Sequence, residues 1–106
     1  MFHHYMCKLF YDSNQITDEM LKSLINEALI AASATIVDSI SYAFEPQGLT
    51  SIWLLSESHA SIHTWPENNI AMIDYFSCAE DPKISKFSEV LITKYSRIIE
   101  EKTIYR

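Results

Sequence analysis

The residue types best suited to chemistry lie in one stretch, from Ser56 to Glu67, which reads Ser-Glu-Ser-His-Ala-Ser-Ile-His-Thr-Trp-Pro-Glu. An apolar run, Ile52 to Leu55, leads into this stretch. Polar groups beside buried segments cost free energy unless they are hydrogen-bonded. A carboxylate, hydroxyls and two imidazoles in this position indicate either a working site or an ordinary polar strand end. The local pattern alone does not distinguish the two.

A longer pattern favours the working site. The order Glu-Ser-His-x-x-Ile-His-Thr-Trp-Pro-Glu over 57–67, followed by Asp-Tyr-Phe-Ser-Cys over 74–78, resembles the self-processing segment of the bacterial S-adenosylmethionine decarboxylases. The matched spacing continues upstream through Ala-Thr-Ile-Val at 34–37 and Phe44-x-Pro46-x-Gly48. The resemblance covers most of the chain and thins at both ends.

In that family a serine attacks the carbonyl before it and converts the peptide bond to an ester. Elimination and hydrolysis then split the chain and leave a pyruvoyl group on the new N-terminus. The resemblance places this serine at Ser58 and the broken bond at Glu57–Ser58, with products 1–57 and 58–106. The pyruvoyl group, the implied covalent cofactor, would form a Schiff base with a substrate amine and act as the electron sink for decarboxylation.

The resemblance also assigns roles to individual side chains. His63 matches the histidine that transfers protons during processing, and Cys78 matches the cysteine that protonates the carbanion. Phe44 and Glu67 match the adenine-stacking ring and the ribose-binding carboxylate, and His4 matches a substrate-binding position. Without the resemblance, His63 reads as a strand histidine, Cys78 as a structural thiol, Phe44 as core and Glu67 as a solvated turn residue.

Three positions depart from the family pattern. Thr50 replaces a serine that assists processing, which keeps the hydroxyl and adds a methyl group. Phe2 stands where a glycine is usual. Lys8 replaces an acidic residue, and a lysine that faced the site would repel the sulfonium of S-adenosylmethionine.

The leading interpretation of the whole pattern is a pyruvoyl-dependent S-adenosylmethionine decarboxylase that provides the aminopropyl donor for spermidine synthesis. A decarboxylase of ornithine or arginine, and a binding or regulatory paralogue that does not self-cleave, remain as alternatives.

Composition limits the class of protein. With 106 residues the chain is expected to form one domain, 1–106, and its 48% hydrophobic content suits a folded globule. Eight Lys and Arg against 14 Asp and Glu give a formal charge of −6, which argues against a nucleic-acid binder. No apolar run is long enough to span a membrane and no signal-peptide pattern opens the sequence. Two cysteines are more simply read as free thiols of a cytoplasmic protein than as a disulfide.

The remaining pattern predicts an α+β fold. Strands are expected over 2–11, 35–44, 50–55, 70–77 and 97–105, with one more through the 56–67 stretch. Helices are expected after Thr17 as N-cap and from Asp81-Pro82, an N-cap followed by a first-turn proline. This order predicts a two-layer sandwich, a largely antiparallel sheet with two amphipathic helices on one face. The resemblance implies the same architecture, and a homodimer with its sites at the interface.

The spacing of Ser58 and His63 carries a geometric prediction. They are five residues apart, so on a regular strand their side chains point to opposite faces. One chain can bring them together only through a bulge, whereas a two-fold dimer can lend His63 across its interface. A zinc site from His59, His63, Cys78 and Glu67 is a third reading, but strand residues four apart lie about 13 Å from each other, too far for one ion. No metal is therefore expected.

Overall fold

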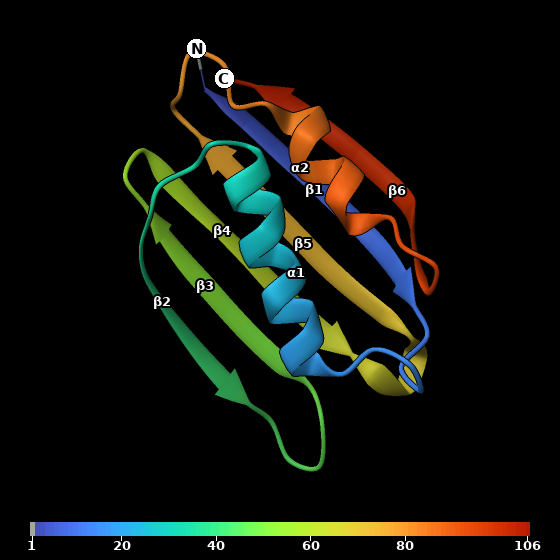
Figure 1. Cartoon of the computed structure of the whole chain (residues 1–106). Coiled ribbons are helices and arrows are strands. Elements are labelled where there is room, and N and C mark those ends of the chain that lie inside the picture. The colour runs from blue at the N-terminus through green and yellow to red at the C-terminus, as the bar shows by residue number, and fades with distance from the viewer. Residues whose placement is uncertain (1) are drawn as a thin grey trace.

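Six strands form one sheet in the computed structural model, which describes residues 2–106 (Figure 1). The strands are β1 (His3–Tyr11), β2 (Ile36–Ala43), β3 (Leu49–Leu55), β4 (Ser58–Trp65), β5 (Ile70–Ser77) and β6 (Ser96–Tyr105). The helices are α1 (Asp18–Ala31) and α2 (Ile84–Leu91), with a short 3-10 helix, η1 (Pro66–Asn68), between β4 and β5. The strand order is β2-β3-β4-β5-β1-β6, and every pairing is antiparallel.

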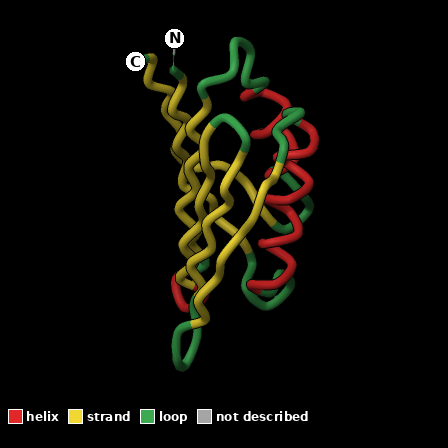
Figure 2. Tube along the Cα trace, turned by 90° about the vertical axis from the view of Figure 1, so that its left-hand side faces the viewer, coloured by secondary structure: helices red, strands yellow, loops and turns green. Residues whose placement is uncertain are grey.

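Both helices pack against the same face of the sheet (Figure 2). Side chains alternate between the two faces along each strand, and those facing the helices form the core. In β1 these are Tyr5, Cys7, Leu9 and Tyr11, all buried. Helix α1 contributes Leu21, Ile25, Ala28 and Leu29, and α2 contributes Phe87 and Leu91. The predicted two-layer α+β sandwich is confirmed.

The other side of the sheet, which we call the open face, is not covered by either helix. Exposed apolar side chains gather there on neighbouring strands: Ile40 and Tyr42 from β2, Ile52 and Leu54 from β3, Trp65 from β4 and Met72 from β5. Strand β2 lies beyond both helices (Figure 1), so most of its residues are exposed on either face. The apolar run that leads into the 56–67 stretch is accordingly only half buried.

The two helix starts have different outcomes. Thr17 caps α1 as predicted, because its side chain accepts a hydrogen bond from the backbone N–H of Met20. The predicted start of α2 at Asp81 is wrong. The Asp81 carboxylate accepts from the N–H of Lys83 at 3.1 Å, which makes a local turn, and Lys83 has a left-handed conformation that keeps it out of the helix. Helix α2 begins at Ile84, and neither helix within residues 2–106 has the length and apolar character needed to cross a bilayer.

Two turns set the ends of the strands that carry the site. Gly48 has a φ of 105°, a conformation that favours glycine, and it joins the β2–β3 loop to β3. Asn69 takes a left-handed conformation at the end of η1, which asparagine tolerates better than most residues. These turns place the β2–β3 loop and η1 at the same end of the sheet (Figure 1).

Candidate active site

Ser58 lies at the start of β4, immediately after the two-residue turn of the β3–β4 hairpin. Its hydroxyl donates a hydrogen bond to the carbonyl oxygen of Glu57, the residue before it. The Ser58 Oγ also lies 3.6 Å from the Cys78 Sγ. A hydroxyl beside the carbonyl of the preceding residue is the arrangement from which an intramolecular acyl shift can begin.

The backbone N–H of Cys78 donates to both the Ser58 hydroxyl oxygen and the Glu57 carbonyl oxygen. It lies 3.0 Å from the Ser58 Oγ and 3.2 Å from the Glu57 carbonyl oxygen. Attack on the Glu57 carbonyl would place negative charge on that oxygen, and a fixed N–H donor stabilises such charge. The main chain of Cys78 could therefore stabilise such an attack independently of the Cys78 thiol.

A small polar cavity of about 150 Å³ lies beside Ser58, and we call it the hairpin pocket. The β3–β4 turn, the segment after α1 and the segment after β5 enclose it. Its hydroxyl and carboxylate side chains are Ser33, Thr35, Ser56, Glu57, Ser58, Tyr75, Ser77 and Asp81. The Tyr75 hydroxyl donates to the Pro82 carbonyl at 3.0 Å, and burial raises the pKa of Tyr75, so the phenol remains a donor. This bond holds the segment that follows Cys78.

Four of the other predicted residues gather at the opposite end of the sheet. A cavity of about 370 Å³, which we call the loop pocket, is lined by Phe44 and Gly48 from the β2–β3 loop, Thr50 from β3, His63, Thr64 and Trp65 from β4, and Glu67 from η1. The Thr50 Oγ1 and the His63 Nδ1 share a hydrogen bond of 2.9 Å. The structure thus brings together Phe44, Thr50, His63 and Glu67, and it separates all four from Ser58 and Cys78.

The prediction that Ser58 and His63 face opposite ways is confirmed. Ala60, Ile62 and Thr64 of β4 are buried toward the helices, whereas His59, Ser61 and His63 lie on the open face. The pairings of β4 with β3 and β5 run without a bulge, so the alternation is unbroken. One chain does not bring the imidazole of His63 to the Ser58 hydroxyl.

His4 belongs to a hydrogen-bonded group on the open face. Its Nε2 lies 2.8 Å from the Asp74 Oδ2, and Ser61 donates to the other Asp74 oxygen. The sequence reasoning gave no role to Ser61 or Asp74. Strand alternation could have placed both on the open face, because Ser61 lies two residues before His63 on β4 and Asp74 two residues before Phe76 on β5. Their pairing with each other depends on the register of β4 against β5, which alternation does not give.

Lys8 also lies on the open face. It lines a shallow cavity of about 560 Å³ together with His4, Asp74 and Glu100, and Glu100 is its direct partner on β6. Lys8 lines neither the hairpin pocket nor the loop pocket. His63 lines this cavity as well as the loop pocket, so within one chain the Lys8 charge lies near one predicted half of the site and away from the hairpin pocket.

The structure offers little to the zinc reading. Within residues 2–106, no three His, Cys, Asp or Glu side chains are arranged to hold a metal ion. Cys78 and Glu67 lie at opposite ends of the sheet, since Glu67 precedes β5 and Cys78 comes directly after it. Cys7 is buried in the core and Cys78 is exposed, and neither forms a disulfide in the described residues.

The fold and these groups define a class of protein. It is a two-layer α+β sandwich in which a strand-borne serine contacts the carbonyl before it, beside a cysteine, while a threonine–histidine pair lies at the far end of the same sheet.

Comparison with known proteins names the family. The sequence profile described as S-adenosylmethionine decarboxylase matches residues 4–98. The chain is 43% identical over 81 residues to an S-adenosylmethionine decarboxylase proenzyme of Prochlorococcus marinus, and 38% identical over 93 residues to one of Methanococcus maripaludis (strain C5). The crystal structure of the adenosylmethionine decarboxylase from Aquifex aeolicus VF5 aligns with a TM-score of 0.80 and 29% identity, and the match covers 100% of this chain and 90% of that one. The chain belongs to the S-adenosylmethionine decarboxylase family.

The matched segments differ in how much of each relative they span. They cover 76% of this chain and 65% of the Prochlorococcus marinus protein, and 79% of this chain and 76% of the Methanococcus maripaludis protein. For the proenzyme of Synechococcus sp. (strain WH7803), 46% identical over 70 residues, the chain spans 55% of the relative's length.

Proposed function

We propose that this chain is a self-cleaving proenzyme of a pyruvoyl-dependent S-adenosylmethionine decarboxylase. The observation that carries the proposal is the contact of the Ser58 hydroxyl with the Glu57 carbonyl, under the shared N–H donor of Cys78. Membership of a family whose relatives are named proenzymes supports it.

Cleavage would follow from groups of this chain. The Ser58 Oγ attacks the Glu57 carbonyl carbon; the new C–O bond forms, the C–N bond breaks, and the Ser58 nitrogen takes a proton, which gives an ester. Loss of the Ser58 Cα proton then breaks the Cβ–Oγ bond and leaves Glu57 as a carboxylate. Water adds to the remaining dehydroalanine and ammonia leaves, so residue 58 becomes the pyruvoyl group.

The residues around Ser58 fit that group. Ser58 is the first residue of β4, so β4 would hold the group at the hairpin pocket beside Cys78. A pyruvoyl ketone supplies an electron sink for loss of carbon dioxide from an amino acid. The thiol of Cys78 is placed to return a proton afterwards, and its exposure leaves it accessible to a substrate.

The loop pocket favours a nucleoside substrate over ornithine or arginine. Phe44 offers an exposed ring for stacking on a base, and Glu67 a carboxylate that can accept hydrogen bonds from ribose hydroxyls. A basic amino acid has neither a base nor a ribose to use these groups. We therefore place S-adenosylmethionine first among the candidate substrates, with decarboxylated S-adenosylmethionine as aminopropyl donor for spermidine.

A second copy of this chain would complete the site. Ser58 and Cys78 of one protomer would meet Phe44, Thr50 and His63 of its partner, with Glu67 beside them. The open face supports a dimer, because it presents a broad set of exposed apolar side chains that a second sheet would bury. The free thiols of Cys7 and Cys78 agree with a cytoplasmic location.

Two measurements test the proposal. Intact-mass analysis after incubation should show fragments 1–57 and 58–106, and Ser58→Ala should remain one chain because alanine has no oxygen to accept the acyl group. Release of carbon dioxide from S-adenosylmethionine, compared with ornithine and arginine, identifies the substrate. A wild-type protein that stays intact after long incubation removes the pyruvoyl mechanism and leaves the regulatory paralogue.

A further inference from the structure

The side chain of Thr64 joins three parts of the molecule that are far apart in sequence. Its Oγ1 accepts a hydrogen bond from the backbone N–H of Leu49 at 2.9 Å and donates one to the Asp18 Oδ1 at 2.9 Å. Leu49 opens β3 directly after the β2–β3 loop, and Asp18 is the first residue of α1. One hydroxyl therefore connects β4 both to the start of β3 and to a helix.

The main chain of Thr64 makes a further close contact. A Cβ added to Gly48 would lie 3.3 Å from the Thr64 carbonyl oxygen, so the β2–β3 loop packs directly on β4 at this residue. The same loop carries Phe44, whose N–H donates to the Gly48 carbonyl at 2.9 Å. Phe44 is thus tied to Gly48, and Gly48 is packed on Thr64.

Thr64 also stands between two residues of the loop pocket. His63 precedes it, and Glu67 follows three residues later, on η1. The loop with Phe44 packs on Thr64, and the short helix with Glu67 begins two residues after it, so both walls of the pocket depend on the position of β4 at this residue. A change in the position of β4 here would alter the gap between the ring and the carboxylate.

Burial of the Thr64 hydroxyl makes the loss of these hydrogen bonds costly. Thr64 is buried, and the buried hydroxyl of Tyr11 lies among Asp18, Thr64 and Glu67. Burial, with Asp18 and Glu67 nearby, raises the pKa of Tyr11 to about 12, so it adds no charge to this cluster near neutral pH. Removing the Thr64 hydroxyl would leave the Leu49 N–H without an acceptor in a site with little access to water.

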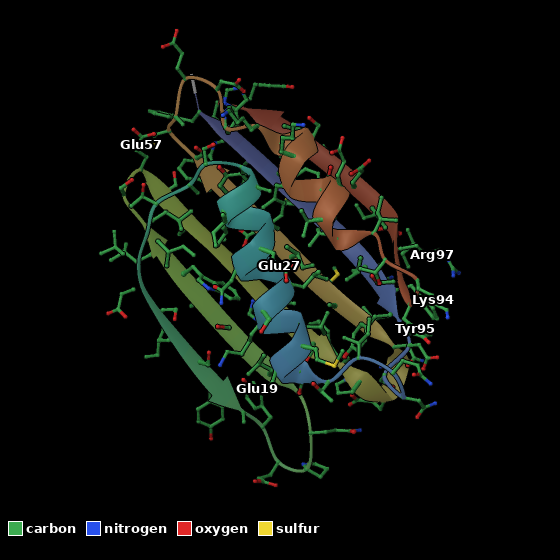
Figure 3. The ribbon with its side chains drawn as sticks, in the orientation of Figure 1. Glu19, Glu27, Glu57, Lys94, Tyr95 and Arg97 are labelled. Atoms are coloured by element: carbon green, nitrogen blue, oxygen red, sulfur yellow. The ribbon has the colours of Figure 1, made fainter. Side chains whose placement is uncertain are left out.

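Asp18 has a use here that its position in the helix does not predict. The sequence places it in the first turn of α1, where an acidic residue is expected to favour the helix dipole. Glu19 has the same property, but it points to solvent with 79% of its side chain exposed and pairs with Lys22 at 3.6 Å (Figure 3). Only Asp18 of the two reaches β4, so Glu19 is its natural control.

We infer that Thr64 and Asp18 are positioning residues for the loop pocket, which hold the Phe44 loop and Glu67 at the separation that a nucleoside requires. This rests on the proposed function, because it takes the loop pocket as the site for the adenosine part of the substrate. Neither residue need touch the substrate. Their effect is expected on binding and not on the cleavage of Glu57–Ser58, whose groups lie at the other end of the sheet.

The test uses full-length protein and separates binding from turnover. Thr64→Val keeps the shape of the side chain and removes the hydroxyl, Thr64→Ser restores the hydroxyl, and Asp18→Ala is compared with Glu19→Ala. In the Ser58→Ala background, calorimetry with 5′-methylthioadenosine measures affinity for a nucleoside without any cleavage. Thr64→Val and Asp18→Ala should weaken binding by about tenfold, a typical effect of a lost buried hydrogen bond, and Thr64→Ser and Glu19→Ala by less than about twofold. In the cleavable protein the same two variants should raise KM by a similar factor, with kcat and the extent of cleavage unchanged.

The outcomes separate this inference from the proposed function. Folded Thr64→Val or Asp18→Ala protein that binds 5′-methylthioadenosine as tightly as the control overturns the inference, as does a control that does not bind the nucleoside. If Thr64→Val fails to fold, the comparison of Asp18→Ala with Glu19→Ala decides. Loss of nucleoside affinity in a chain that never cleaves or decarboxylates would support the positioning role and refute the proposed activity.

Discussion

The separation of Ser58 from His63 yields a prediction about which chain is cut in a mixed dimer. Five strand residues span about 16 Å, and the two side chains point to opposite faces, whereas a proton transfer needs about 3 Å between heavy atoms. In the shared site, His63 of one protomer would serve Ser58 of its partner. A dimer of Ser58→Ala with His63→Ala then has one site that carries both lesions and one that carries neither.

The expected result is cleavage of the His63→Ala chain alone. With equal amounts of the two chains and random pairing, roughly half of the His63→Ala chains are in mixed dimers, so up to roughly half should be cut before fractionation and most of them in the isolated mixed dimers. Each chain carries a different tag, the mixed dimers are isolated through both tags, and intact-mass analysis identifies the fragments. His63→Ala expressed alone is the control and should remain largely intact.

Two results would refute the reasoning. Equal cleavage of His63→Ala alone and in verified mixed dimers would show that His63 has no part in processing. No cleavage of either chain in mixed dimers, with the wild type cut normally, would show that one chain assembles its own site through a rearrangement of β4.

Three further predictions concern single residues. Cys78→Ala should still allow some cleavage but lower productive decarboxylation by about 100-fold or more, since the proton donor is lost; unchanged turnover, measured as carbon dioxide release, would make Cys78 structural. Gly48→Ala should destabilise the fold by about 1–3 kcal/mol in urea unfolding, because alanine is strained at a φ of 105° and its Cβ would press on the Thr64 carbonyl; an unchanged midpoint would contradict this. Burial raises the pKa of Cys7 from 9.0 to about 12, so the unfolded chain loses its thiol proton first as the pH rises through this window. The free energy of unfolding should therefore fall by up to about 1.4 kcal/mol per pH unit more steeply in the wild type than in Cys7→Ala. Equal slopes in the two proteins would contradict this.

The sequence predicted the elements well where local chemistry decides them. Thr17 has a hydroxyl that caps a helix, so the start of α1 was predicted correctly. At Asp81 two local options compete, since an aspartate can cap a helix or close a turn. The left-handed Lys83 selects the turn, and no pattern in the sequence reveals that choice.

In the candidate site too, the sequence predicted the features that depend on local geometry and missed the contacts between distant residues. Strand alternation placed Ser58 and His63 on opposite faces because the period of two is a property of every regular strand. The contacts of Asp74 with His4 and Ser61, and of Thr64 with Asp18, join residues 13 to 70 positions apart. They depend on register and on the placement of α1 over the sheet, which a single sequence does not specify.

The strand order gives cleavage an unusual physical outcome. A cut at Glu57–Ser58 would assign β1, β2 and β3 to one fragment and β4, β5 and β6 to the other. In the sheet, β1 lies between β5 and β6, so the first fragment is inserted into the second. The products could part only by breaking both pairings of β1 and the pairing of β3 with β4, which amounts to global unfolding. Before the cut, refolding is a reaction of one polypeptide; afterwards two must meet, at a rate that falls with dilution. Maturation would thus leave the assembled sheet unchanged while removing its ability to refold as a single chain.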